Sequence, residues 1–150
     1  MDKVKKYKEV VSDLSHYFQG YSIDRTAKMS IIASTLSNKF PEWIFCGFYR
    51  VVDEELLEIG PYQSSIVPCG QIKFSNGVCG MSARERKSII VDNVNYFDGY
   101  ISCDDETISE IVVPVFLDNK LIGVLDIDGD SEGQFDHTDK KYLEDIVDLL

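Results

Sequence analysis

The 150-residue chain carries 26 acidic and 15 basic residues, which gives a formal net charge of −11 at pH 7, and 44% of its residues are hydrophobic. This length and composition predict a single domain over residues 1–150, and the negative charge argues against binding to the phosphate backbone of nucleic acids. Residues 1–14 lack the continuous apolar stretch of a signal peptide and no window reaches the length of a membrane span, so we expect a cytoplasmic protein without a membrane partner.

Local sequence patterns predict the order of helices and strands. Apolar residues at helical spacing mark helices, and runs of aromatic and β-branched residues between turn residues mark strands. In chain order we predict helices at 3–19 and 24–39, strands at 43–52, 56–63 and 69–74, a short helix within 76–86, strands at 88–94, 110–117 and 120–128, and a C-terminal helix that begins near Asp136 or Thr138. Strands joined by hairpins form mainly antiparallel sheets, so the predicted fold is α+β, with about six strands flanked by helices.

Two parts of this pattern bear on binding. The polar loop at 95–109 is longer than the other connections, and long loops more often act as lids or binding segments. The apolar pattern of the C-terminal helix continues to Leu150, which leaves an apolar stripe for a partner helix. A homodimer through the terminal helices is therefore a hypothesis.

The strand at 120–128 carries two acids. In a regular strand one face carries Leu121, Gly123, Leu125 and Ile127, and the other carries Ile122, Val124, Asp126 and Asp128. The two carboxylates would lie about 7 Å apart. Such a pair is unfavourable unless water, a metal ion or a cationic ligand lies over it.

A metal site or a bound cofactor is not expected. The segment DIDGDSEGQFDH has acids at three positions of an EF-hand loop, but Ser131 stands where the turn glycine belongs and His137 where the bidentate glutamate belongs. The four cysteines and two histidines of the chain lack the paired CxxC spacing of a zinc site.

Instead, the hairpin that turns at Asp118-Asn119 is expected to bring Glu110 near Asp126 or Asp128. Three carboxyl groups in a partly desolvated site raise one another's pKa, so that one could donate a proton while the others bind an ammonium group. The alternative is that these acids are simply solvated at a strand end.

The cysteines differ in their surroundings. Cys46 alternates with aromatic residues in the strand at 43–52 and fits the role of a small buried hydrophobic residue. Cys103 lies in the polar loop beside Asp104 and Asp105, where little apolar burial is available. Because neighbouring carboxylates disfavour a thiolate, activation of Cys103 would have to come from the substrate, backbone amides or a protonated acid.

Several of these residues occur in a recognisable order. Pro61, Gln63, Cys69 and Cys79-Gly80, followed by NVNYFDGYISCDDETISEIVVPV and IGVLDID, resemble the free methionine-(R)-sulfoxide reductases, which are enzymes built on a GAF fold. The likeness extends from about Trp43 to the C-terminal helix. It implies a GAF-like α+β domain that reduces free methionine-(R)-sulfoxide.

The resemblance also implies a two-stage reaction. The cysteine that matches Cys103 attacks the sulfoxide sulfur, methionine leaves, and the cysteine becomes a sulfenic acid. The cysteine that matches Cys69 then condenses with it to a disulfide, which thioredoxin reduces. Cys79 matches a third family cysteine, either an alternative resolving thiol or a structural residue of its turn.

The matching acids, Glu110, Asp126 and Asp128, would protonate the departing oxygen and hold the α-ammonium of the free amino acid. Tyr49 matches an aromatic residue of the pocket that packs against the substrate methyl group. Phe45 stands where the family commonly has tryptophan, whereas the tryptophan here is Trp43, two residues earlier and therefore expected on the same strand face.

Two other functions stay open at this point. Many GAF domains bind small ligands without catalysis, although a nucleotide phosphate would meet an acidic pocket here. A thiol redox sensor in which Cys69 and Cys103 pair without turning over a substrate is the other alternative.

Overall fold

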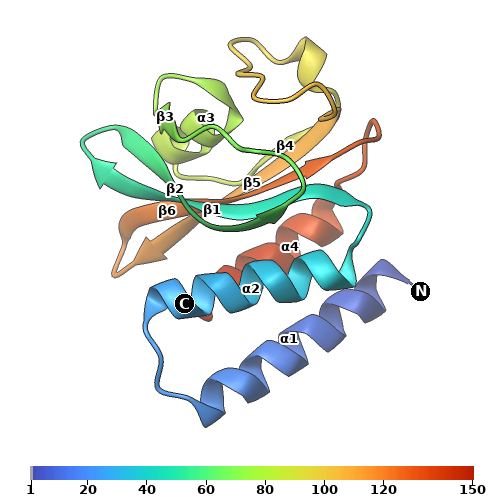
Figure 1. Cartoon of the computed structure of the whole chain (residues 1–150), viewed down its shortest axis with the longest axis vertical. Coiled ribbons are helices and arrows are strands. Elements are labelled where there is room, and N and C mark those ends of the chain that lie inside the picture. Colours follow the sequence, from blue (N-terminus) through green and yellow to red (C-terminus); the bar gives the residue numbers. More distant parts are fainter. Residues whose placement is uncertain (1) are drawn as a thin grey trace.

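One antiparallel sheet divides the molecule into two layers (Figure 1). We describe residues 2–150 in a computed structural model, and within them the strands are β1 (Trp43–Asp53), β2 (Leu56–Ser64), β3 (Gln71–Lys73), β4 (Ile89–Val91), β5 (Ser109–Leu117) and β6 (Lys120–Gly129). Their order across the sheet is β3-β2-β1-β6-β5-β4, and each neighbouring pair is antiparallel. The predicted α+β fold with a six-stranded antiparallel sheet is confirmed.

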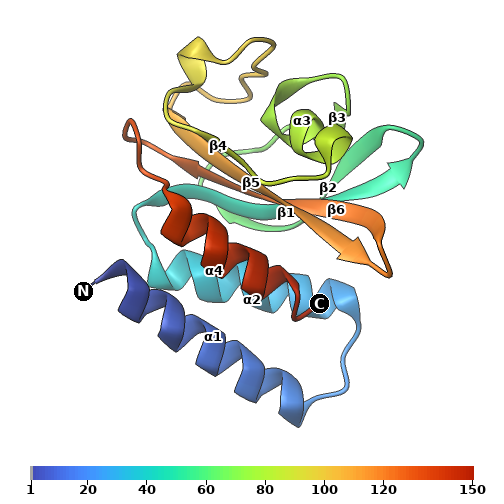
Figure 2. The same ribbon diagram turned by 180° about the vertical axis from the view of Figure 1, so that it is seen from behind.

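Helices cover the two faces of the sheet unequally. Figures 1 and 2 show α1 (Lys3–Gly20), α2 (Arg25–Lys39) and α4 (His137–Val147) on one side, and the short α3 (Gly77–Glu85) with the loop at 92–108 on the other. A short 3₁₀ turn, η1 (Val94–Tyr96), lies at the start of that loop. In the described part of the chain, we find no helix with the length and apolar character needed to cross a membrane.

Aspartate side chains cap the starts of α2 and α4. The Asp24 carboxylate accepts a hydrogen bond from the backbone N–H of Ala27 at 2.9 Å, and Asp136 forms a capping box with Asp139 at the start of α4. Asp139 is itself buried and accepts a hydrogen bond from the Tyr7 hydroxyl at 2.6 Å. The Tyr7–Asp139 hydrogen bond joins α1 to α4.

The sheet has an apolar core on each face. The helix-side core includes Tyr7, Leu14, Ile32, Leu36, Cys46, Phe48, Leu125, Ile127 and Leu143. The opposite core, beneath α3 and the loop at 92–108, includes Phe45, Tyr49, Leu57, Ile72, Val78, Cys79, Val112 and Val124. The second core forms the floor and walls of a pocket.

A β-bulge in β1 overturns one prediction. Trp43 pairs with Gly129 and Phe45 pairs with Asp128, so Ile44 is an extra residue in β1. The bulge turns Trp43 to the helix side, where its ring stacks on Phe40 with 4.3 Å between ring centroids. The expectation that Trp43 shares a strand face with Phe45 is therefore wrong.

A second bulge lies in β6. Phe116 pairs with Leu121 but Val115 pairs with Gly123, which leaves Ile122 as the extra residue. Leu121 therefore lies on the pocket side and Ile122 packs against the helix-side core, the reverse of the regular alternation we predicted. From Val124 to Asp128 the predicted alternation holds.

Candidate active site

Three carboxyl groups lie on the sheet face opposite α1, α2 and α4. Glu110 on β5 pairs directly with Asp128 on β6, and Asp126 follows two residues away on the same face. Direct antiparallel partners point to the same side of a sheet, so these residues form one group, here called the acidic cluster. Glu110 and Asp126 are only 5% and 6% exposed, and Asp128 is partly exposed.

Burial dominates the electrostatics of the acidic cluster. It raises the pKa of Glu110 well above its ordinary value, and the charges of Asp126 and Asp128 raise it further. Burial raises the pKa of Asp126 to about 6, although hydrogen bonds from Glu110 and Cys79 oppose the shift. Burial and the charge of Asp126 raise the pKa of Asp128 as well. The cluster therefore retains protons at a pH where exposed carboxyl groups are ionised.

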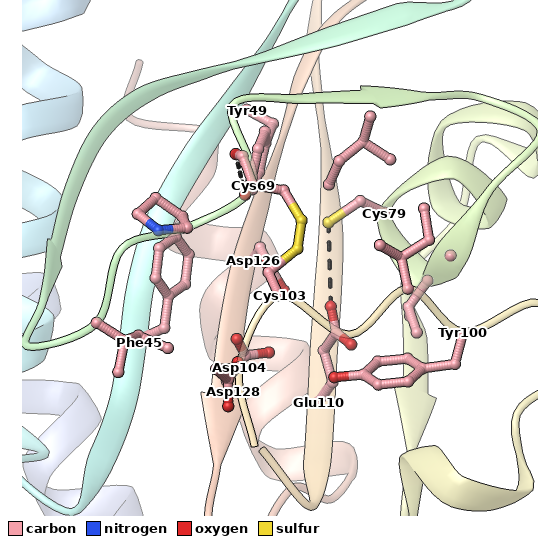
Figure 3. A pocket seen from close by; sticks show the side chains of 16 residues that line it. Phe45, Tyr49, Cys69, Cys79, Tyr100, Cys103, Asp104, Glu110, Asp126 and Asp128 are labelled. Carbon is pink, nitrogen blue, oxygen red and sulfur yellow. Dashed lines mark hydrogen bonds between the residues drawn. A yellow bond between two sulfur atoms is a disulfide. The ribbon is translucent and has the colours of Figure 1, made fainter. Parts of the chain in front are cut away.

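Cys79 extends the cluster from α3. Its thiol is buried and lies 4.0 Å from Oε1 of Glu110 (Figure 3). Burial, and then the charges of Asp126 and Glu110, raise the pKa of the Cys79 thiol well above its ordinary value. Cys79 is therefore a neutral thiol in this arrangement. Its sulfur and one oxygen of each of Glu110 and Asp126 lie within 4.8 Å of one another, a spacing that could also hold a metal ion.

A disulfide joins Cys69 to Cys103 beside the acidic cluster (Figure 3). Cys69 lies in the segment between β2 and β3, and Cys103 lies in the long polar loop before β5. The two residues are 34 positions apart in sequence, and their Cα atoms are 5.6 Å apart. This is the pairing that the family resemblance implies. Cys46, by contrast, is buried in the helix-side core, as its sequence position predicts.

Aromatic side chains line the pocket around these groups. Phe45 and Tyr49 lie on the pocket face of β1, with their ring centroids 6.4 Å apart. The Tyr49 hydroxyl donates a hydrogen bond to the carbonyl oxygen of Cys69 at 2.9 Å. Tyr100, from the loop that carries Cys103, also lines the pocket, and burial raises the pKa of its hydroxyl. In the disulfide form the cavity has a volume of about 40 Å³, enough for a few water molecules.

The structure thus brings together the residues that the sequence and the resemblance single out. The pocket is lined by Phe45, Tyr49, Cys69, Cys79, Cys103, Glu110, Asp126 and Asp128. It also includes Tyr100 and Asp104, which the sequence analysis did not name as site residues. The Asp-x-x-Thr spacing of Asp104 and Thr107 is a signal for a side chain that caps a turn, and it could have identified Asp104.

Comparison with known proteins gives one family. Residues 23–150 match the GAF domain. The free methionine-R-sulfoxide reductase of Escherichia coli (strain K12) is 34% identical over 145 residues, which are 95% of this chain and 87% of that protein. The free methionine-R-sulfoxide reductase of Saccharomyces cerevisiae is 46% identical over 110 residues, which are 71% of this chain and 60% of that protein. The solved structure of the free methionine-R-sulfoxide reductase from Neisseria meningitidis, in complex with its substrate, matches with a TM-score of 0.93 at 34% identity and covers 99% of this chain and 88% of that chain.

Proposed function

This chain belongs to the free methionine-R-sulfoxide reductase family of GAF-domain proteins, and from that membership we propose that it reduces free L-methionine-(R)-S-oxide to L-methionine. The observation that carries the proposal is the Cys69–Cys103 disulfide at the mouth of a pocket lined by the acidic cluster. A pair of thiols supplies the two electrons of the reduction. Of the buried carboxyl groups, one supplies a proton to the sulfoxide oxygen and the others supply the negative charge that binds the substrate.

In the first step the Cys103 sulfur attacks the sulfoxide sulfur. The bond between the two sulfur atoms then breaks as the S–O bond of the sulfoxide is lost and the oxygen passes to Cys103; Cys103 is oxidised to a sulfenic acid and the sulfoxide is reduced to the thioether methionine, which leaves. In the second step the Cys69 thiol condenses with the sulfenic acid, which releases water and forms the disulfide. A dithiol reductant, for which we propose thioredoxin, then returns both cysteines to thiols and is itself oxidised to a disulfide.

The acidic cluster serves two purposes in this scheme. A carboxyl group that keeps its proton near neutral pH can donate it to the sulfoxide oxygen as the S–O bond breaks. A neighbouring carboxylate binds the α-ammonium of the substrate, and the buried Oδ1 of Asp126, which has no hydrogen-bond partner, is suited to accept from it. Methionine within a peptide has no α-ammonium, so the cluster favours the free amino acid.

The aromatic wall gives the stereochemical preference. With the ammonium on the acidic cluster and the sulfur at Cys103, the substrate methyl group would pack on Tyr49 and Phe45, and only one sulfoxide epimer then directs its oxygen to a carboxyl group. Cys79 lies next to Glu110, where it would serve as the alternative resolving thiol.

The size of the cavity indicates when the substrate binds. In the disulfide form the Cys103 loop is tied across the pocket to Cys69 and the cavity is only about 40 Å³, so we infer that this form opens before a new substrate enters. Reduction of the disulfide releases the loop that carries Cys103 from Cys69. We therefore propose that the substrate binds to the dithiol form.

An epimer assay tests the proposed function. With dithiothreitol as reductant, we expect loss of the R epimer of free methionine sulfoxide, no loss of the S epimer, and no activity in Cys103→Ser. The control is Cys46→Ala, which changes a buried thiol on the helix side and should keep R-specific turnover. Full activity in Cys103→Ser would refute the assigned nucleophile. If the wild type consumed neither epimer, the disulfide would instead mark a redox sensor.

A further inference from the structure

One side chain closes the turn that carries Cys103. Oδ1 of Asp104 accepts hydrogen bonds from the backbone N–H groups of Glu106 at 2.7 Å and Thr107 at 2.8 Å, and Oδ2 accepts from the Thr107 hydroxyl at 3.0 Å. The Ser102 hydroxyl donates to the carbonyl oxygen of Asp104 at 2.6 Å. Hydrogen bonds to a carboxylate are stronger than bonds between neutral groups. Residues 102–107, here called the Cys103 turn, are therefore fixed mainly by Asp104.

The Cys103 turn is attached to the sheet at its far end. Thr107 is buried, and the next residue, Ile108, donates a backbone hydrogen bond to Gly129 at 2.8 Å and accepts one from Val94 at 2.8 Å. Asp104, the residue next to Cys103, is thus tied through Thr107 to a part of the chain that is fixed to β6.

The partner cysteine is held independently. The Tyr49 hydroxyl donates to the Cys69 carbonyl, and Tyr49 is itself buried on the pocket face of β1. A disulfide between residues 34 positions apart forms readily only if both sulfur atoms are held close to each other. Tyr49 holds Cys69 in place, so the Cys103 turn has to hold the second sulfur atom.

We propose that Asp104 is a positioning residue, whose carboxylate holds the Cys103 sulfur at the bonding position of Cys69 and so favours formation of the disulfide. Its importance for turnover rests on the proposed function, because resolution of the sulfenic acid needs the same approach of the two sulfur atoms. The positioning itself can be measured without any sulfoxide substrate.

The test is a glutathione redox equilibrium of the full chain. The protein disulfide reacts with two glutathione thiols to give the two cysteine thiols and glutathione disulfide, and the equilibrium constant reports the effective concentration of the two thiols. We expect Asp104→Ala to lower this effective concentration about tenfold, the size of effect that a lost capping carboxylate produces.

Two matched variants separate the hydrogen bonds of Asp104 from its charge. In Asp104→Asn the amide oxygen still accepts from both backbone N–H groups, and the amide NH2 can donate to the Thr107 hydroxyl, so the effective concentration should stay within about threefold of the wild type. Asp105→Ala removes the neighbouring exposed acid and should leave the equilibrium unchanged. An Asp104→Asn protein as impaired as Asp104→Ala, or an equal loss in Asp105→Ala, would show that charge or general loosening of the loop is responsible, and either result would overturn the proposal.

A milder change covers the case in which Asp104→Ala fails to fold, which circular dichroism of the reduced protein would reveal. Thr107→Val removes only the hydroxyl group that donates to Asp104, and we expect a reduction of about threefold in effective concentration. If Asp104→Ala folds and has the same equilibrium constant as the wild type, the positioning role is overturned. If only Thr107→Val folds, an equilibrium constant equal to that of the wild type in that variant overturns it. Because glutathione replaces the substrate, these outcomes are independent of whether methionine sulfoxide is consumed.

Discussion

Replacement of Asp126 with asparagine should stabilise the folded protein near neutral pH while it weakens substrate binding. Burial raises the pKa of Asp126 from 3.8 to about 6, so the folded state binds a proton more tightly than the unfolded state. The free energy of unfolding of the wild type therefore falls as pH rises from 3.8 to about 6, and it stays lower above that range. The shift corresponds to about 3 kcal/mol, which is the most that removal of this ionisation can return.

Urea denaturation of the oxidised protein between about pH 4 and about pH 7.5 measures this effect. Asparagine has nearly the shape of aspartate, so any packing cost of the substitution is independent of pH and cancels between the two ends of the range. As pH rises over this range, we expect Asp126→Asn to become more stable relative to the wild type. The change in the difference between their unfolding free energies should be about 1 to 3 kcal/mol.

The control is Asp105→Asn, which removes one negative charge from an exposed position of the long loop. Its difference from the wild type should not change with pH in the same way. If the difference in unfolding free energy between Asp126→Asn and the wild type is constant across the pH range, burial of the ionised Asp126 carboxylate does not destabilise the folded protein and the argument is refuted.

Four further predictions follow from the site and the fold. Glu110→Gln should slow methionine release in a single turnover by about 10²-fold to 10⁴-fold, the usual range for loss of a proton donor, and a rate within about twofold of the wild type would exclude Glu110 from that role. Calorimetry should detect binding of methionine sulfoxide to a Cys69→Ser/Cys103→Ser protein but much weaker binding to the disulfide form; equal affinities would contradict the need for opening. Gly47→Ala should lower the free energy of unfolding by about 2 kcal/mol, because a Cβ there would overlap the Cβ of Tyr62, and a stability unchanged in urea denaturation would be the opposite result. Light scattering should give the mass of a dimer at micromolar concentration, and a monomer would count against pairing of the terminal helices.

Most of the fold could be predicted from the sequence because its signals are local. The Asp118-Asn119 turn is an example: both residues have positive φ, 51° and 64°, as a two-residue hairpin turn requires. The caps at Asp24 and Asp136 are equally local, since each uses residues within one helical turn. The disulfide could not be predicted in this way. It joins two loops from different parts of the chain, and only the resemblance to a known family connected Cys69 with Cys103.

The two errors in side-chain orientation have the same kind of cause, a β-bulge in β1 and another in β6. Strict alternation places Trp43 on the face of Phe45, but one extra residue in β1 moves Trp43 to the helix side. A bulge depends on how two strands fit together, so it leaves little signal in either strand alone. Asp104 was missed for a different reason: its spacing to Thr107 signals a capped turn, but that signal was not used, and the hydrogen bonds of Asp104 show which turn it holds.

The bulge in β6 also explains how the acidic cluster can form. Leu117 pairs with Lys120 beside the turn, and regular counting back from that pair would place Glu110 opposite Ile127. Glu110 would then share a face with Ile127 and lie away from Asp126 and Asp128. The extra residue Ile122 shifts the register by one, so that Glu110 pairs with Asp128 instead. The chemistry proposed for this pocket therefore depends on a single inserted residue located beyond the pocket, close to the hairpin turn.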